Sequence, residues 1–171
     1  MSREIIQNFC DLISKDSLLV QGTGGNVSWK DKKKLWVKAS GTSLSETLKK
    51  NIFVPLDLEI INSQVQNGSF NLIKDNHAKI LRPSIETMFH AILPYKYVLH
   101  LHAVDPLSSL VRQSKVENHV WEKCPCNPIL INYKKPGDEL AKEIYNVSSQ
   151  KFFSKLYLLK NHGINVNKFF Y

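Results

Sequence analysis

The chain has 171 residues, of which 43% are hydrophobic and 22% charged. This composition is typical of a globular domain and excludes a disordered or fibrous chain. Its apolar runs fall short of the roughly 18–20 residues that span a membrane. Charged residues within the first apolar pattern also exclude a secretory signal. Three cysteines (Cys10, Cys124 and Cys126) do not make a disulfide framework, and the last two are expected only to pack. We therefore expect one domain over residues 1–171 in a cytoplasmic protein.

The net charge of +8 raises the question of nucleic-acid binding. Of the 23 basic residues, however, only Arg3, Arg82 and Arg112 are arginines, and arginine dominates the reading of base edges. The chain also lacks the interleaved aromatic and basic residues of single-strand binders. Lysine clusters at 32–34 and 49–50 fall where turns and helix ends are expected. We expect no nucleic-acid partner, and the positive field suits a phosphorylated or acidic small substrate.

The first half of the chain begins with apolar residues at helical spacing and continues with short strand-like runs. Two small-residue turns separate these runs. The expected elements are a helix over 5–13, a glycine-rich turn over 21–26, a hairpin of strands at 27–29 and 35–37, a turn at 39–42, a helix near 45–50, strand-like runs at 52–54 and 56–61, and strand and loop over 62–80.

The second half alternates helices and strands. The expected elements are a helix beginning at Pro83 and Ser84 and reaching Ile92, a strand over 97–103, a helix over 107–111, a strand at 129–131, a helix over 138–147 and a strand at 156–159. This alternation, together with the hairpin, favours a layered α/β domain with a mixed or antiparallel sheet.

Two histidines lie one residue apart in the run Y-V-L-H-L-H-A. Side chains alternate along a strand, so His100 and His102 point to the same face, roughly 6–7 Å apart at the backbone. The pair is therefore either a surface accident or half of a metal site. A catalytic zinc site needs a third protein ligand, and His162 is the best candidate because it ends a predicted strand just before Gly163. The remaining histidines are weaker candidates: His77, His90 and His119.

Glu86 lies near the start of a predicted helix and off its apolar face. A carboxylate beside a divalent cation can bind the cation or act as a general base. Alternatively, the carboxylate only interacts favourably with the helix dipole.

The segment G-T-G-G-N contains closely spaced glycines, which let backbone N–H groups converge on an anion. Thr23 and Asn26 add side-chain donors to it, and Ser40, Gly41 and Ser84 offer similar small groups elsewhere. The spacing matches neither a dinucleotide fingerprint nor a phosphate-binding loop with its lysine.

Taken in order, G-T-G-G-N-V-S, V-K-A-S-G-T-S-L, R-P-S-I-E-T, H-L-H and N-H-G resemble the class II aldolase/adducin head family over about residues 20–166. The segment R-P-S-I-E-T-x-x-H-A-I-L-P is most similar to the aldolase half of the bifunctional rhamnulose phosphate aldolase/alcohol dehydrogenase branch. The resemblance implies a three-layer α/β/α domain with a mixed, largely antiparallel central sheet.

The resemblance also implies an activity: a zinc-dependent aldolase-type lyase that cleaves a carbon–carbon bond of a small phosphorylated keto sugar through a metal-stabilised enediolate. It assigns one zinc per chain to His100, His102 and His162, with another divalent metal as an alternative. It assigns proton transfer to Glu86. The residues that match the substrate-phosphate site are Thr23, Gly25, Asn26, Ser40, Gly41 and Ser84.

Two departures from the family pattern bear on these expectations. Ile85 stands where sugar-phosphate aldolases often have a second serine, so the phosphate site has one donor fewer. The chain ends at Tyr171, whereas relatives continue with C-terminal helices; the family tetramer is implied as well. The same site suits a decarboxylase, dehydratase or epimerase, or a keto acid substrate, and an adducin-like module without turnover is a further alternative.

Overall fold

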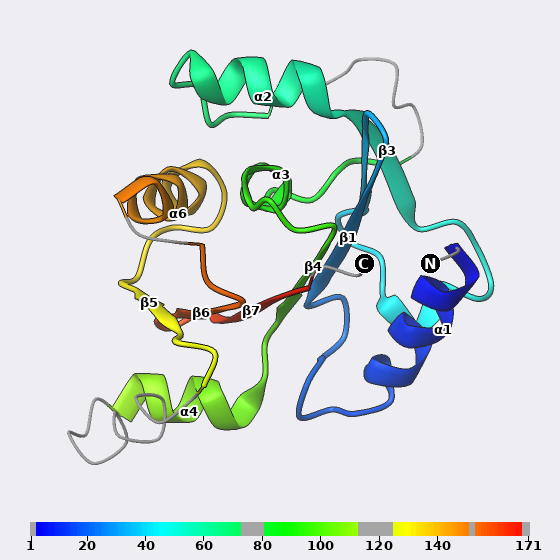
Figure 1. Ribbon diagram of the computed structural model, residues 1–171. Coiled ribbons are helices and arrows are strands. Elements are labelled where there is room, and N and C mark those ends of the chain that lie inside the picture. The colour runs from blue at the N-terminus through cyan, green and yellow to red at the C-terminus, as the bar shows by residue number, and fades with distance from the viewer. Residues whose placement is uncertain (1–2, 73–80, 113–124, 151–152, 169–171) are drawn as a thin grey trace.

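The computed structural model describes residues 3–72, 81–112, 125–150 and 153–168. Figure 1 shows helices on both faces of a central sheet. The seven strands are ordered β3-β2-β1-β4-β7-β6-β5. They are β1 (Asn26–Asp31), β2 (Lys34–Lys38), β3 (Phe53–Asp57), β4 (Tyr97–Leu101), β5 (Ile129–Ile131), β6 (Leu156–Leu159) and β7 (Gly163–Lys168). Neighbouring strands are antiparallel except for the parallel pair β5 and β6. The expected three-layer α/β/α architecture with a mixed, largely antiparallel sheet is confirmed.

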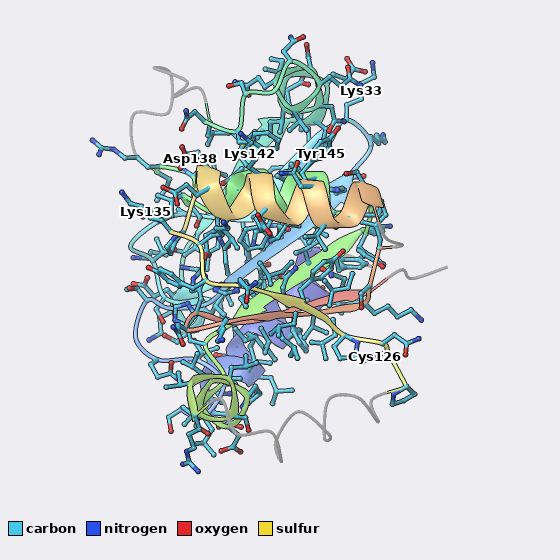
Figure 2. The ribbon with its side chains drawn as sticks, turned by 90° about the vertical axis from the view of Figure 1, so that its left-hand side faces the viewer. Lys33, Cys126, Lys135, Asp138, Lys142 and Tyr145 are labelled. Atoms are coloured by element: carbon cyan, nitrogen blue, oxygen red, sulfur yellow. The ribbon has the colours of Figure 1, made fainter. Side chains whose placement is uncertain are left out.

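Helices pack on both sides of this sheet. The described helices are α1 (Arg3–Ser14), the 3-10 helix η1 (Leu44–Glu46), α2 (Leu58–Gln66), α3 (Thr87–Ile92), α4 (Val104–Arg112) and α6 (Asp138–Gln150). One face carries α2, α3 and α6, whereas α1 and α4 lie on the other side (Figure 1). Figure 2 shows α6 lying across its face of the sheet, with Asp138 at its start. Within these described ranges, none of the helices has the length and apolar character needed to cross a membrane.

Each face of the sheet has its own apolar core. Under α2, α3 and α6 the cluster includes buried side chains of these helices and of the sheet, among them Val37, Ile61, Met88, Val98, Ile144 and Tyr157. Under α1 a second cluster includes Ile6, Cys10, Val27, Trp29, Phe53 and Leu101. Burial of this apolar surface from both sides is the main force that holds the layers together.

The hairpin expected around the lysine turn is formed by β1 and β2. Its register places Trp29 opposite Trp36, and their rings stack with centroids 5.6 Å apart. The Phe53 ring meets Trp29 edge-on at 4.7 Å. These aromatic contacts stabilise the register of β1, β2 and β3.

The strand-like run expected at 56–61 is wrong beyond Asp57, because α2 begins at Leu58; α2 also continues through residues 62–66, where strand and loop were expected. Asp57 is its N-cap, and its carboxylate accepts hydrogen bonds from the N–H groups of Glu59 and Ile60 at 2.8 and 3.2 Å. Ile61 and Val65, one turn apart, are the apolar residues that α2 buries. Capping and a helical burial pattern outweigh the β-branched pair at 60–61.

Three smaller differences also separate the structure from the expectation. The helix expected near 45–50 is only the short η1, which begins with a capping box at Ser43. Strand β7 was not expected, although its sequence G-I-N-V-N-K alternates apolar and polar residues as a half-buried strand does. Cys126 is disulfide-bonded, which corrects the expectation that it only packs; Cys124 lies outside the described residues.

Candidate metal centre

Three histidines meet at one end of the two central strands. His100 lies in β4, His102 follows that strand, and His162 lies in the turn before β7. The pairing of Leu101 with Ile164 brings this turn beside the end of β4. One ligand nitrogen from each histidine lies within 4.8 Å of the other two. The structure therefore brings together the three histidines that the sequence singled out. His77 and His119 lie outside the described residues.

The turn at His162 depends on the glycine that follows it. A Cβ atom at Gly163 would collide with the carbonyl oxygen of Leu101, and it would lie 3.2 Å from Cε1 of His100. Only glycine permits such close backbone approach. Gly163 thus allows His162 to lie against His100, with ring centroids 4.7 Å apart.

The glycine-rich loop before β1 packs against the same histidines. Gly25 has a φ of +71°, and a Cβ there would lie 3.2 Å from the carbonyl oxygen of His100. A Cβ at Gly24 would lie 3.0 Å from Nδ1 of His102. Asn26 pairs directly with His100 across β1 and β4. Its side chain is 1% exposed, and neither amide atom has a hydrogen-bond partner, so this buried polar group beside His100 is not used by the fold.

The Glu86 carboxylate faces the histidines from the start of α3. It is the N-cap residue of α3 and is 8% exposed. Its Oε1 atom lies 3.1 Å from Nε2 of His162 and 3.4 Å from Nε2 of His100. Burial acts to raise the pKa of Glu86, but the facing imidazoles outweigh it and hold this pKa at about 2. Glu86 is therefore an ionised carboxylate beside the cluster.

Two of the imidazoles, those of His100 and His102, are in the neutral form that binds cations. Burial lowers the pKa of His100 from 6.5 to about 4 and also lowers the pKa of His102, so both rings are neutral at pH 7. His100 Nε2 and His162 Nδ1 are buried and have no hydrogen-bond partner. Three imidazoles and a carboxylate are the donors typical of a zinc site. The residues present therefore fit a divalent cation.

Lys38 connects the loops around the centre, and sequence reasoning missed it. Its side chain is 3% exposed, and Nζ donates to the carbonyl oxygens of Thr23 at 3.1 Å and Thr42 at 2.7 Å. Burial lowers the pKa of Lys38, while the negative charge of Glu86 acts to raise it. The only signal in the sequence was a lysine between two apolar residues, Val37 and Ala39.

The residues expected to bind phosphate lie in three neighbouring segments. Lys38 joins the loop that contains Thr23 and Gly25, and that leads to Asn26 at the start of β1, to the turn that contains Ser40 and Gly41. An isolated bridge between Ala39 and Pro83 adds the segment with Ser84. Thr23, Ser40 and Gly41 are exposed, and Ser84 is half-buried. Ser84 also has a structural contact, because its Oγ accepts a hydrogen bond from the N–H of Glu86 at 3.2 Å.

The chain matches a known family model and is similar in sequence to a known protein. The family model of the Class II Aldolase and Adducin N-terminal domain matches residues 4–167. The uncharacterized oxidoreductase YuxG of Bacillus subtilis (strain 168) is 29% identical over 174 residues. The match covers 90% of this chain and 24% of YuxG, so the chain spans about a quarter of that relative's length.

Solved structures agree on the fold. The N-terminal class II aldolase domain of a conserved protein from Thermoplasma acidophilum superposes with a TM-score of 0.77 at 26% identity, covering 98% of this chain and 84% of that one. For YgbL from Escherichia coli, a putative aldolase/epimerase/decarboxylase, the TM-score is 0.67 at 20% identity, and the match covers 96% of this chain and 77% of YgbL. For the L-fuculose-1-phosphate aldolase of Thermus thermophilus the TM-score is 0.59 at 15% identity, and the match covers 97% of this chain and 80% of that aldolase.

Proposed function

The chain belongs to the class II aldolase and adducin family, and on that premise we propose that it is a metal-dependent aldolase-type lyase. The substrate class is a small, phosphorylated keto sugar. The unit that acts is a single class II aldolase-like domain over residues 1–171. One observation carries the proposal: the Glu86 carboxylate lies 3.1 Å from His162, within a cluster whose ligand nitrogens are within 4.8 Å of one another.

His100, His102 and His162 would hold the cation, which we propose to be one zinc ion per chain. When bound, zinc polarises a carbonyl group as a Lewis acid. A three-histidine site leaves a coordination position open for substrate, as catalytic zinc sites do. His102 and His162 are only partly buried, which gives substrate a side from which to approach.

Glu86 would carry the proton. When the bond between the α and β carbons of a β-hydroxy ketone breaks, the β-hydroxyl loses its proton and becomes an aldehyde. The bonding electron pair stays with the α carbon, which then gains a proton. In the reverse direction the same carboxylate removes that proton. An ionised carboxylate close to two imidazoles is placed for this exchange, and its burial limits competition from water.

The small residues around the centre would bind the substrate phosphate. Exposed hydroxyl and backbone N–H groups on adjoining loops suit an anion, and Lys38 adds a buried positive charge between the loops. Ile85, which is 64% exposed, adds no donor. The proposed phosphate-binding residues are Thr23, Gly25, Asn26, Ser40, Gly41 and Ser84.

The same centre also suits a decarboxylase, dehydratase or epimerase, and a keto acid as substrate. The fold shared with YgbL, whose structure is described as that of a putative aldolase/epimerase/decarboxylase, favours keeping these reactions in the assay. The three histidines and Glu86 together argue against an adducin-like module without turnover. A homotetramer in the cytoplasm is the assembly and location that we propose.

Metal analysis of the purified protein, combined with a screen of phosphorylated ketoses and keto acids, tests the proposal. We expect about one zinc per chain, metal loss in His102→Ala, and aldehyde release from a ketose phosphate. A wild-type preparation that holds no metal and takes up no added zinc would refute the metal-dependent reaction. Release of carbon dioxide, a dehydrated sugar or an epimer would instead identify a decarboxylase, a dehydratase or an epimerase.

A further inference from the structure

A buried hydrogen bond joins β1 to the helix that carries Glu86. The Oγ atom of Ser28 lies 2.7 Å from Nδ1 of His90. Ser28 is 1% exposed and His90 is fully buried. The His90 ring also stacks on Phe89, with centroids 4.5 Å apart. None of the chemistry proposed above uses this pair, although polar groups in a core cost free energy unless they are paired.

His90 is connected to Glu86 through the backbone. Its N–H donates to the carbonyl oxygen of Glu86 at 3.4 Å, one helical turn away. On the other side, the N–H of Glu86 donates to Ser84 Oγ at 3.2 Å. Since α3 has only six residues, its own hydrogen bonds cannot keep it helical without outside support. The contact between Ser28 and His90 supports the turn that begins at Glu86.

A separate contact from β1 supports the other end of α3. Lys30 lies two residues after Ser28 on the same face of the strand, and its Nζ donates to the carbonyl oxygens of Ala91, at 2.7 Å, and Leu93. The two contacts therefore divide the helix between them: Ser28 holds the turn near Glu86, and Lys30 holds the C-terminal end. This division supplies a matched control.

The charge state and the ring contacts of His90 both indicate an indirect influence on the metal centre. Burial lowers the pKa of His90 to about 3, so the ring is neutral and adds no charge beside Glu86. Phe89, on which His90 stacks, meets the His100 ring edge-on, with centroids 5.8 Å apart. The pair thus touches the surroundings of the centre without adding a charge or a ligand to it.

We propose that Ser28 and His90 are positioning residues that hold the Glu86 carboxylate against the three-histidine cluster. The inference rests on the proposed function for the importance of that carboxylate. Removal of either partner lets the first turn of α3 shift, whereas removal of the Lys30 contact loosens only the far end. The effect of Ser28 or His90 on the metal then passes through Glu86.

Crystal structures of metal-free protein test the placement directly. In wild-type protein and in Lys30→Met, we expect Glu86 Oε1 to stay within hydrogen-bond distance of His162 Nε2. In Ser28→Ala and His90→Gln we expect this separation to exceed about 3.5 Å, the limit of a hydrogen bond. An unmoved carboxylate in both of these variants would overturn the proposal. This result does not depend on whether the protein binds metal.

A double-mutant cycle on Co²⁺ affinity, read by titration calorimetry, tests whether the effect passes through Glu86. We expect His90→Gln to weaken Co²⁺ binding about tenfold in the wild-type background, as loss of a group that orients a metal site does. In the Glu86→Gln background we expect the same change to have less than about a twofold effect. Equal effects in the two backgrounds, or no effect in the first, would overturn the proposal. Absence of Co²⁺ binding by wild-type protein would instead refute the proposed function, and the metal-free structures would still decide the positioning role.

Discussion

Glu86 and His162, far apart in the sequence, meet through a 3.1 Å contact between Oε1 and Nε2. The contact joins the N-terminus of α3 to the turn before β7. It leaves a buried carboxylate beside imidazoles that otherwise have unpartnered nitrogens. This relationship makes the histidine cluster a candidate for catalysis as well as for metal binding.

Replacement of Glu86 by glutamine should abolish turnover and leave the metal bound. The amide keeps the size of the carboxylate but cannot accept the proton, so we expect kcat to fall about 10²–10⁴-fold. With zinc supplied in excess, zinc content should stay near one per chain despite a weaker affinity. The control is Glu59→Gln, because Glu59 is exposed and pairs with Lys33 on the surface. Full activity in Glu86→Gln would remove Glu86 from its proposed role.

Loss of His102 should remove the stabilisation that zinc confers on wild-type protein. A ligand that binds only the folded state at 100 times its Kd adds about 2.7 kcal/mol to the free energy of unfolding. We therefore expect added zinc to raise the Tm of wild-type protein and to leave that of His102→Ala unchanged. An equal rise in Tm for both proteins would show that the zinc binds elsewhere.

Gly163→Ala should destabilise the fold more than Gly68→Ala. Both glycines have positive φ values, but a Cβ at Gly68 meets nothing within 4 Å, whereas one at Gly163 collides with the carbonyl oxygen of Leu101. We expect a loss of about 1 kcal/mol at Gly68 from backbone strain alone and about 3 kcal/mol at Gly163. Urea unfolding measures both losses, and equal losses would contradict the close approach described for the turn.

Stability of the metal-free protein should fall as the pH drops below about 6.5. Burial keeps His90 neutral in the folded state, with a pKa of about 3 against 6.5 for the free side chain. Between these values the unfolded chain binds the proton more readily, so folding is progressively weakened as the pH falls. The slope for one such group is up to about 1.4 kcal/mol per pH unit.

The comparison between wild-type protein and His90→Gln isolates this contribution. Urea unfolding at pH 7, 6 and 5 should show a smaller loss of stability in the variant, because glutamine does not titrate. An identical pH dependence in both proteins would show that His90 is not held neutral by the fold.

Lys38→Met should separate the two loops that border the centre. The variant leaves the carbonyl groups of Thr23 and Thr42 without their donor, so we expect the free energy of unfolding to fall by about 2 kcal/mol. KM for a phosphorylated substrate should rise, since the loops carry the proposed phosphate site. Lys34→Met, an exposed lysine of the same strand, is the matched control. Equal effects of the two changes would contradict the connecting role of Lys38.

The histidines were identifiable from the sequence because their pattern is local and ordered. The H-x-H pair needs only the alternation of a strand, and His162 is marked by the glycine after it. The contact of Glu86 with His162 could not be read in the same way, because it depends on how β4 pairs with β7. Strand β7 itself was missed: its alternating pattern fits a strand, but Asn165 and Asn167, which the fold buries, belong to a residue type that is uncommon in strands.

Local signals also explain the other differences between the expected and observed fold. The Ile60-Ile61 pair favours a strand by propensity, yet the cap at Asp57 starts a helix there. The position of Lys38 between two apolar residues was only a weak sign of burial, because a lysine near a turn is usually exposed. Its partners are carbonyl groups brought near by the fold, and no sequence pattern announces them.

The most direct test of the central claim is aldehyde release from a panel of phosphorylated ketoses, measured before and after removal of metal by a chelator. We predict release from at least one ketose, loss of that release on chelation, and recovery when zinc is added back. Zinc-loaded protein that cleaves none of the panel, or cleavage that survives complete metal removal, would contradict a metal-dependent lyase.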